Sequence, residues 1–135
     1  MRRILTAAAV GLCLLAAGCG DGKLRTKGRL LKGGQPCVPA EGESFNVTFV
    51  PIPPDGKPPV DYYFAAFDPS DGTFRPAGKD GKGMPPGKYR VAVEHMKGKR
   101  DLLGGRYDAE RSPFVFDVDA GTSEIAIDLD NPPKS

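Results

Sequence analysis

Cys19 is the residue with the clearest chemistry, because it directly follows an apolar segment that looks cleavable. Arg2 and Arg3 give the chain a short cationic start, and residues 4–18 are uncharged and mostly apolar. The run ends in small residues, as a signal peptidase requires, and it is shorter than the roughly 18 apolar residues that a membrane-spanning helix needs. The sequence therefore predicts a signal-peptide helix over residues 1–18, with cleavage directly before Cys19.

The residues around this cleavage point favour lipid attachment. Residues 15–19, Leu-Ala-Ala-Gly-Cys, resemble the lipobox of bacterial lipoproteins, with Ala16 where leucine is commoner. The resemblance implies that a diacylglycerol is joined to the Cys19 thiol and that the new amino group is often acylated too, for example with palmitate. Two or more acyl chains give stable anchoring, since each buried CH₂ contributes about 0.8 kcal/mol. An ordinary cleaved signal and an uncleaved anchor are the alternatives.

A lipid on Cys19 predicts a cell-envelope protein. Residues 19–23 would form a lipidated tether, and the chain would face the periplasm or the exterior. Gly20 stands directly after the cysteine, where an aspartate retains some lipoproteins at the inner membrane, so the outer membrane is favoured. The expected partners are the membrane itself and an envelope protein or polysaccharide.

Cys37 is left without a partner in the processed chain. Cys13 lies in the discarded signal and Cys19 carries the lipid, so the third cysteine cannot pair within the chain. We expect Cys37 to be a half-buried small apolar residue near a strand end. An intermolecular disulfide in an oxidising compartment is the alternative.

Charge and composition narrow the class of protein. Loss of Arg2 and Arg3 reduces the 19 basic residues to 17, which equals the 17 acidic residues, so the processed chain is neutral. Neutrality argues against electrostatic binding of nucleic acid. The 18 glycines and 14 prolines are not periodic and separate apolar runs, as is typical of short strands joined by turns.

His95 is the one histidine of the sequence, and it falls in the inward-facing series of a predicted strand. A general base needs a nucleophile and an orienting partner, and no serine or cysteine lies in a motif such as Gly-x-Ser-x-Gly. One histidine and one free cysteine also cannot supply the usual ligands of zinc. We therefore expect a structural histidine, no enzymatic activity and no cofactor.

Seven short strands are predicted from alternating apolar residues and from the turns between them. The clearest are residues 44–50 and 88–96, in which every second residue is apolar. In the aromatic run before Asp68, Phe64 and Phe67 are both expected to be buried, through a bulge. Such a series indicates an all-β sandwich. The segments span residues 24–31, 44–50, 60–67, 73–75, 88–96, 114–118 and 125–129.

The last two strands are predicted to pair as a hairpin. Keeping both apolar sets on the core side pairs Val118 with Ile125 and Phe114 with Leu129. The outer face would then gather five carboxylates, which are the one weak candidate for a metal site, because Ca²⁺ takes six to eight oxygens. A solvated face that discourages edge pairing is the alternative, and no calcium-loop motif is present. These carboxylates are Asp117, Asp119, Glu124, Asp128 and Asp130.

Two further features could contact a ligand. The connection over residues 97–111 is basic and could touch anionic envelope polymers or lipid headgroups, although a charged loop is usually only solvated. Tyr62 and Tyr63 follow a proline-rich loop, and one of them must point outward, where it could stack on a sugar. The cations of the connection are Lys97, Lys99, Arg100, Arg106 and Arg111.

Four short sequence segments resemble those of a known protein family. The most specific is Pro-Pro-Gly-Lys-Tyr-Arg-Val at residues 85–91, and the others lie at residues 27–30, 45–51 and 71–74. In this order they resemble small bacterial lipoproteins of the carboxypeptidase regulatory-like, transthyretin-like (prealbumin-like) type. The resemblance implies a seven-stranded Greek-key sandwich over residues 24–130, a flexible tail over residues 131–135 and a non-catalytic module. The hydroxyisourate hydrolase of this fold ends in Tyr-Arg-Gly-Ser and uses histidines, and this chain lacks both features.

Together these features predict a lipid-anchored envelope protein that acts as a non-catalytic interaction or adhesion module. A carbohydrate-binding envelope lipoprotein is the alternative hypothesis, and a hydrolase is the least expected one.

Overall fold

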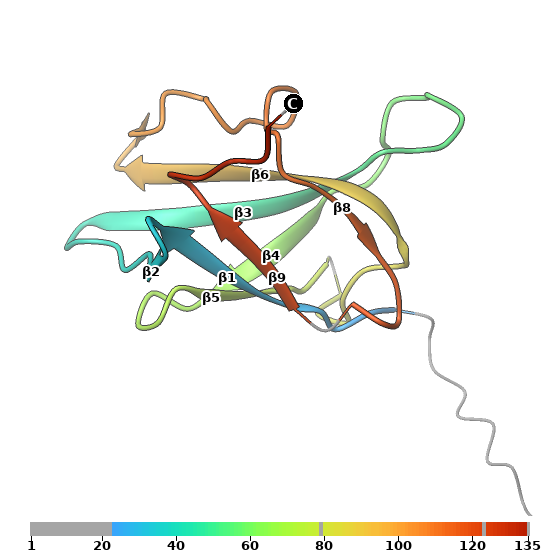
Figure 1. The fold of residues 1–135 in the computed structure, drawn as a ribbon, viewed down its shortest axis with the longest axis horizontal. Helices are drawn as coiled ribbons and strands as arrows, with labels where there is room; N and C mark the ends of the chain where they lie inside the picture. Colours follow the sequence, from blue (N-terminus) through green and yellow to red (C-terminus); the bar gives the residue numbers. More distant parts are fainter. Residues whose placement is uncertain (1–22, 79, 123, 135) are drawn as a thin grey trace, which may run out of the picture.

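The computed structural model describes residues 23–78, 80–122 and 124–134 (Figure 1). The predicted signal, the lipid site at Cys19 and most of the predicted tether lie outside these ranges. Within them the chain is all-β and has no helix, so no described helix could cross a bilayer. The prediction of an all-β fold is confirmed for this part of the chain.

Nine strands are present in the described ranges. Seven correspond to the predicted segments, with bounds shifted by up to three residues, and two more are two-residue strands beside tight turns. Gly33 and Gly34 form one of these turns, and both have the positive φ that favours glycine. The strands are β1 (Lys27–Lys32), β2 (Gln35–Pro36), β3 (Glu43–Pro51), β4 (Tyr63–Phe67), β5 (Thr73–Pro76), β6 (Gly87–Lys97), β7 (Arg100–Asp101), β8 (Val115–Val118) and β9 (Glu124–Asp128).

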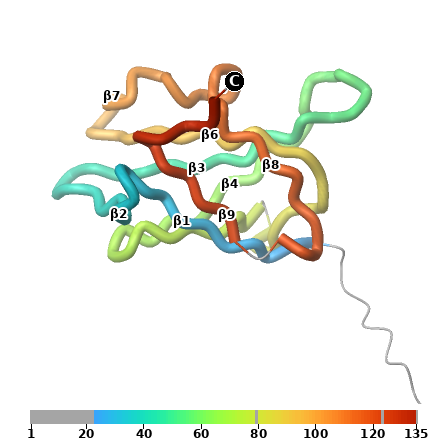
Figure 2. The backbone as a smooth tube through the Cα atoms, viewed as in Figure 1, coloured from blue at the N-terminus to red at the C-terminus, as the bar shows by residue number. Residues whose placement is uncertain are grey.

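The strands form one bent sheet that packs against itself in a sandwich-like arrangement (Figures 1 and 2). Its order is β2-β1-β5-β4-β3-β6-β7, with β8 added to β6 and β9 added to β1. The bend falls at β4, whose first residues pair with β3 and whose last residues pair with β5. The sheet does not close, because β8 and β9 pair with different strands at its two ends.

The core lies between the two halves of the bent sheet. The predicted inward residues of the two clearest strands are buried, and they pack with apolar residues of the opposite half such as Leu30, Phe74 and Ile127. Gly28 allows the halves to approach, because a Cβ at this position would lie only 2.1 Å from the ring of Phe74. The inward residues are Phe45, Val47 and Phe49 on β3, and Tyr89, Val91 and Val93 on β6.

The predicted hairpin of the last two strands is wrong. Residue alternation identified the inward faces correctly, since Phe114, Val118, Ile125 and Leu129 are all buried. However, β8 pairs antiparallel with β6, and β9 pairs parallel with β1. Each strand thereby satisfies a different open edge of the sheet, where backbone groups would otherwise lack partners.

The prediction for the aromatic strand is also wrong in one respect. Phe64 is 61% exposed, whereas Tyr63, Ala65 and Phe67 pack against the core. The strand alternates regularly, so no bulge turns Phe64 inward.

Candidate functional site

Two neighbouring grooves lie beside β6, and the larger one extends to the chain that follows β9. We name the larger, of about 780 Å³, the arginine groove, and the smaller, of about 570 Å³, the proline groove. They share Arg90 and Glu110. The arginine groove is lined by Arg90, Arg106, Tyr107, Glu110, Arg111, Ser112, Pro113, Val115, Leu129, Asp130, Pro132, Pro133 and Lys134. The proline groove is lined by Val50, Pro51, Ile52, Pro53, Gly56, Lys57, Pro58, Pro59, Tyr62, Arg90, Ala109 and Glu110.

Arg90 lies at the junction because of the period-two geometry of β6. Its neighbours Tyr89 and Val91 point into the core, so Arg90 points outward. The strand registers place Val50 of β3 and Val115 of β8 on either side of it. Its aliphatic stem can therefore cover apolar surface while its guanidinium reaches the grooves.

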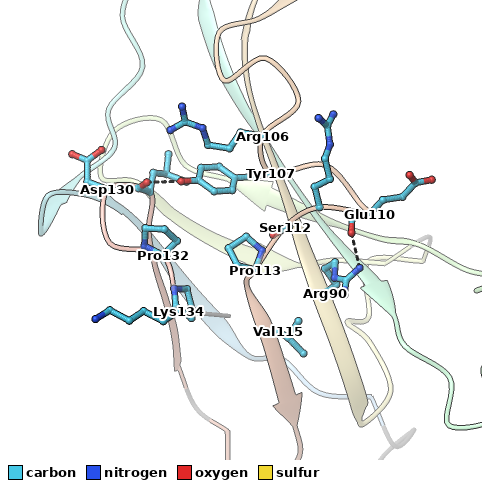
Figure 3. Close-up of a pocket in the computed structure, with 13 residues that line it drawn as sticks. Arg90, Arg106, Tyr107, Glu110, Ser112, Pro113, Val115, Asp130, Pro132 and Lys134 are labelled. Carbon is cyan, nitrogen blue, oxygen red and sulfur yellow. Dashed lines mark hydrogen bonds between the residues drawn. The ribbon is translucent and has the colours of Figure 1, made fainter.

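The guanidinium of Arg90 is incompletely paired among the described residues. Its Nη1 donates to the backbone oxygen of Glu110 at 2.8 Å (Figure 3). Its Nε is buried and has no acceptor among them. Because a guanidinium carries five N–H donors, Arg90 has hydrogen-bonding capacity that its described partners do not use.

Residues 107–112, which form one wall of the arginine groove, are held in place by buried polar contacts. The hydroxyl of Tyr107 donates to the backbone oxygen of Leu129 at 2.7 Å (Figure 3), and the hydroxyl of Ser112 donates to the backbone oxygen of Val91. Tyr107 also packs on Phe114, with ring centroids 5.1 Å apart. Together with backbone bonds from the N–H groups of Val91 and Val93 to the oxygens of Phe114 and Tyr107, these contacts hold residues 107–112 along the edge of β6 that also pairs with β8.

Cations outnumber carboxylates along this wall. Arg90, Arg106, Arg111 and Lys134 line the arginine groove, against Glu110 and Asp130. Arg111 is paired with Asp108, with Nη2 at 2.6 Å from Oδ2. The hydrogen bond from Arg111 lowers the pKa of Asp108, and backbone N–H groups add to this effect. Arg106 is exposed and lies in the predicted basic connection.

The proline groove is mostly apolar, although Lys57, Arg90 and Glu110 also line it, and Tyr62 forms part of its surface. Tyr62 is 42% exposed, whereas Tyr63 packs edge-on against Tyr89 in the core, with centroids 5.9 Å apart. The prediction that one tyrosine of the pair points outward is therefore confirmed. The loop over residues 52–59 is attached at its start, where the N–H of Ile52 donates to the backbone oxygen of Lys88 at 2.8 Å.

His95 lies away from both grooves, near the end of β6. Its Nε2 is 2.8 Å from Oε2 of Glu43, and its ring stacks on Phe45 with centroids 4.2 Å apart. The hydrogen bond from His95 lowers the pKa of Glu43, which also has Lys97 nearby. Neither side-chain partner of His95 is a nucleophile, so these contacts support the structural role that the sequence predicted.

Cys37 is buried directly after β2, with 5% of its surface exposed. Its backbone N–H donates to the backbone oxygen of Leu30 at 2.9 Å. Burial raises the pKa of the thiol to about 11, although Lys32 acts in the opposite direction. A protonated thiol is a weak nucleophile and a weak metal ligand, so this position suits a small apolar residue.

The five candidate metal carboxylates do not come together. Because the predicted hairpin does not form, Asp117 and Asp119 lie at one end of the sheet path and the other three at the opposite end. Glu124 forms an ion pair with Arg29, and Asp128 accepts N–H bonds from Gly33 and Gly34, each at 2.9 Å. No group of three or more potential metal ligands is found in the described ranges.

Sequence reasoning missed the junction at Arg90 and the contribution of the chain end. Residue alternation along β6 sets Arg90 opposite the inward residues Tyr89 and Val91, but nothing local shows that Glu110 lies within reach of its side chain. Pro132, Pro133 and Lys134, predicted as part of a flexible tail, line the arginine groove (Figure 3). One signal was available, since Val50 and Val115 are apolar residues at outward positions next to an outward arginine.

Comparison of the chain with protein-family models, with curated proteins and with solved structures found no match. The argument for function therefore depends on the geometry of the site.

Proposed function

We propose that this chain is a lipid-anchored cell-envelope protein that acts as a non-catalytic binding module, with its ligand lying across the arginine and proline grooves. The lipid would be carried by Cys19. The outer membrane is the favoured site, with the module facing the periplasm or the exterior.

The observation that carries this proposal is the placement of the segments that line the arginine groove relative to the start of the fold. The described chain begins at Lys23, at the lower right of the view, whereas residues 105–113 and the C-terminus lie along the upper side (Figures 1 and 2). A module attached to a membrane just before Lys23 would thus hold the arginine groove away from the membrane surface. This is the geometry that an interaction or adhesion module requires. The proline groove lies nearer, since Asp61, next to Tyr62, lines a pocket with Lys23.

The state of the reactive side chains supports a non-catalytic role. His95 is engaged with Glu43 and Phe45, the thiol of Cys37 is buried, and the hydroxyl of Ser112 is bonded to a backbone oxygen. None of these groups faces another in the nucleophile and base arrangement that acyl transfer needs.

The test is site-directed photo-crosslinking in intact cell envelopes. A diazirine amino acid replaces Val115, which is 38% exposed in the arginine groove, or Val38, which is 59% exposed and lines neither groove. We expect one reproducible crosslinked species from position 115 and none from position 38. The same species from both positions, or none from position 115, would contradict the proposal.

Anchoring is tested separately by Cys19→Ala. We expect the parent to partition into the detergent phase and the variant to remain in the aqueous phase. A variant that partitions like the parent would show that the lipid is not on Cys19.

The proposal includes the fold family that the sequence resembles. An all-β chain with two packed halves is what a carboxypeptidase regulatory-like, transthyretin-like domain would have, and such domains serve as non-catalytic modules. The Greek-key strand order is the finer expectation that an experimental structure of residues 24–130 would test.

Carbohydrate binding is the second candidate function, and Tyr62 is the observation that favours it. A partly exposed tyrosine beside flat proline surfaces offers a stacking platform for a sugar ring. A glycan-binding screen with the parent and with Tyr62→Ala tests it. Lack of binding to every envelope polysaccharide would reject this candidate.

A further inference from the structure

We infer that the ligand of the joined grooves is an acidic polysaccharide whose carboxylate groups lie in the arginine groove and whose sugar rings lie on the proline groove. This inference rests on the proposed function and adds the chemical class of the ligand.

The first argument is charge. Five cations line the two grooves, namely Lys57, Arg90, Arg106, Arg111 and Lys134, and Glu110 and Asp130 are the carboxylates that line them. Arg111 and Lys57 are already paired with Asp108 and Asp55. With these partners counted, five cations face four carboxylates. The processed chain as a whole is neutral, so this face has a local excess of positive charge. A cleft lined by one sign of charge concentrates ligands of the opposite sign.

The second argument is the type of cation. Three of the five are arginines, and a guanidinium binds a carboxylate through two parallel N–H bonds. Arg111 already binds Asp108, and the Nε of Arg90 is buried. A carboxylate in the arginine groove would therefore pair with the guanidinium of the exposed Arg106.

The third argument is the combination of apolar and charged surface. Val115 and Pro113 line the arginine groove between Lys134 and Arg90 (Figure 3). Tyr62 and prolines extend this surface into the second groove. Sugar rings have apolar faces and polar edges, so an acidic sugar chain matches both kinds of surface along its whole length.

The shape of the site favours a chain over a single small molecule. Each groove has the volume of a site for one small ligand, and Arg90 and Glu110 line both grooves. Anionic headgroups of the anchoring membrane fit the arginine groove less well, because residues 105–113 and the C-terminus lie on the other side of the fold from its start (Figure 2).

The experiment measures binding of an oligouronate of defined length to the intact chain in neutral detergent. The matched probe is the methyl ester of the same oligomer, which keeps the rings and removes the charge. We expect the free acid to bind at least roughly tenfold more tightly than the ester, with affinity that falls as salt rises.

Two variants locate the binding site. Arg106→Gln and Lys134→Gln remove exposed cations of the arginine groove, and Lys134 lies so near the chain end that its loss leaves the core untouched. We expect each to weaken binding of the free acid several-fold. Arg100→Gln is the matched control, because it removes the same charge from the same basic connection outside both grooves, and it should keep the parent's affinity.

The outcomes separate this inference from the proposed function. Three results would each overturn the acidic-polysaccharide assignment. The first is equal affinity for the free acid and the ester, and the second is an equal loss of affinity in Arg100→Gln and Arg106→Gln. The third is binding of polyglutamate or of phosphatidylglycerol vesicles as tight as that of the oligouronate. Failure of the oligouronate to bind, together with a crosslinked species at Val115, would overturn only the inference. Failure of both would reject the proposed function as well.

Discussion

Cys37 shows how burial controls the chemistry of a single residue. The pKa of its thiol is raised to about 11 by burial, from an ordinary value of 9.0. At pH 8 the thiolate fraction is then about a hundredfold lower in the folded protein than in the unfolded chain. We expect iodoacetamide to label Cys37 at least about a hundredfold more slowly without urea than with it, as measured by mass spectrometry of its peptide. Equal rates in both conditions would contradict this account of Cys37.

The lowered pKa of Glu43 should make the stability of the fold depend on pH. Its pKa is lowered in the folded state by the hydrogen bond from His95. A carboxyl with a lowered pKa stabilises the fold above its unfolded pKa, and this contribution is lost as pH falls through the folded pKa. The contribution of Glu43 is therefore present at pH 7 and decreases below its ordinary value of 4.5.

The corresponding variant is Glu43→Gln. We expect its urea midpoint to be lower than that of the parent at pH 7 and to approach the parent's midpoint at pH 3. The exposed neighbour Glu41 provides the control Glu41→Gln, which should follow the parent at both values. A deficit of Glu43→Gln that is the same at pH 3 and pH 7 would mean that its charge is not the cause.

The inward faces of the strands could be predicted from the sequence, but their pairing partners could not, because residue alternation shows only which side chains share a face. The apolar residues of β8 and β9 were assigned to the core correctly, from Phe114 to Leu129. Their pairing with β6 and β1 depends on which sheet edges are left open by residues far away in the sequence. Short connections favour hairpins only when no better edge is available.

The register of β9 can be tested with paired cysteines. Arg29 and Ala126 are partners in the parallel pairing of β1 and β9, and both are exposed. In the predicted hairpin, Asp117 would instead oppose Ala126. We expect Arg29→Cys with Ala126→Cys to form a disulfide under mild oxidation, and Asp117→Cys with Ala126→Cys to stay reduced. The opposite pattern, read by mass spectrometry of the peptides, would support the hairpin.

The hydrogen bond of Tyr107 is predicted to hold residues 107–112 in place beside the arginine groove. Tyr107→Phe removes a buried hydroxyl and leaves the backbone oxygen of Leu129 without its donor. We expect a loss of about 1–3 kcal/mol in the free energy of unfolding, together with faster amide exchange over residues 105–112. Tyr62→Phe, which changes a partly exposed tyrosine, should alter neither quantity. An unchanged Tyr107→Phe variant would mean that this bond does not hold the segment.

The candidate site was less predictable than the fold for a physical reason. Arg90 is separated from Glu110 by 20 residues and from Lys134 by more than 40, and no short motif connects them. The basic connection and the outward tyrosine were found as separate features of the sequence. Only the packing of residues 107–112 along the edge of β6 places them at two neighbouring grooves.

At the scale of the whole molecule, one bent sheet would separate the two proposed roles. The first described residues lie at one side of the fold, and residues 105–113 with the chain end lie at another (Figure 1). These segments line the arginine groove, which extends from β6 and β8 to the chain that follows β9. An anchor before Lys23 and a ligand at Arg90 would therefore not compete for the same surface.

The most direct test of the central claim is chemical-shift mapping with the oligouronate, using isotopically labelled protein in detergent micelles. The account predicts that titration shifts the amide signals of Tyr62, Arg90 and Val115, and that the signals of β1, β5 and β9 stay in place. Shifts confined to β1, β5 and β9, or no shifts at saturating oligouronate, would contradict it.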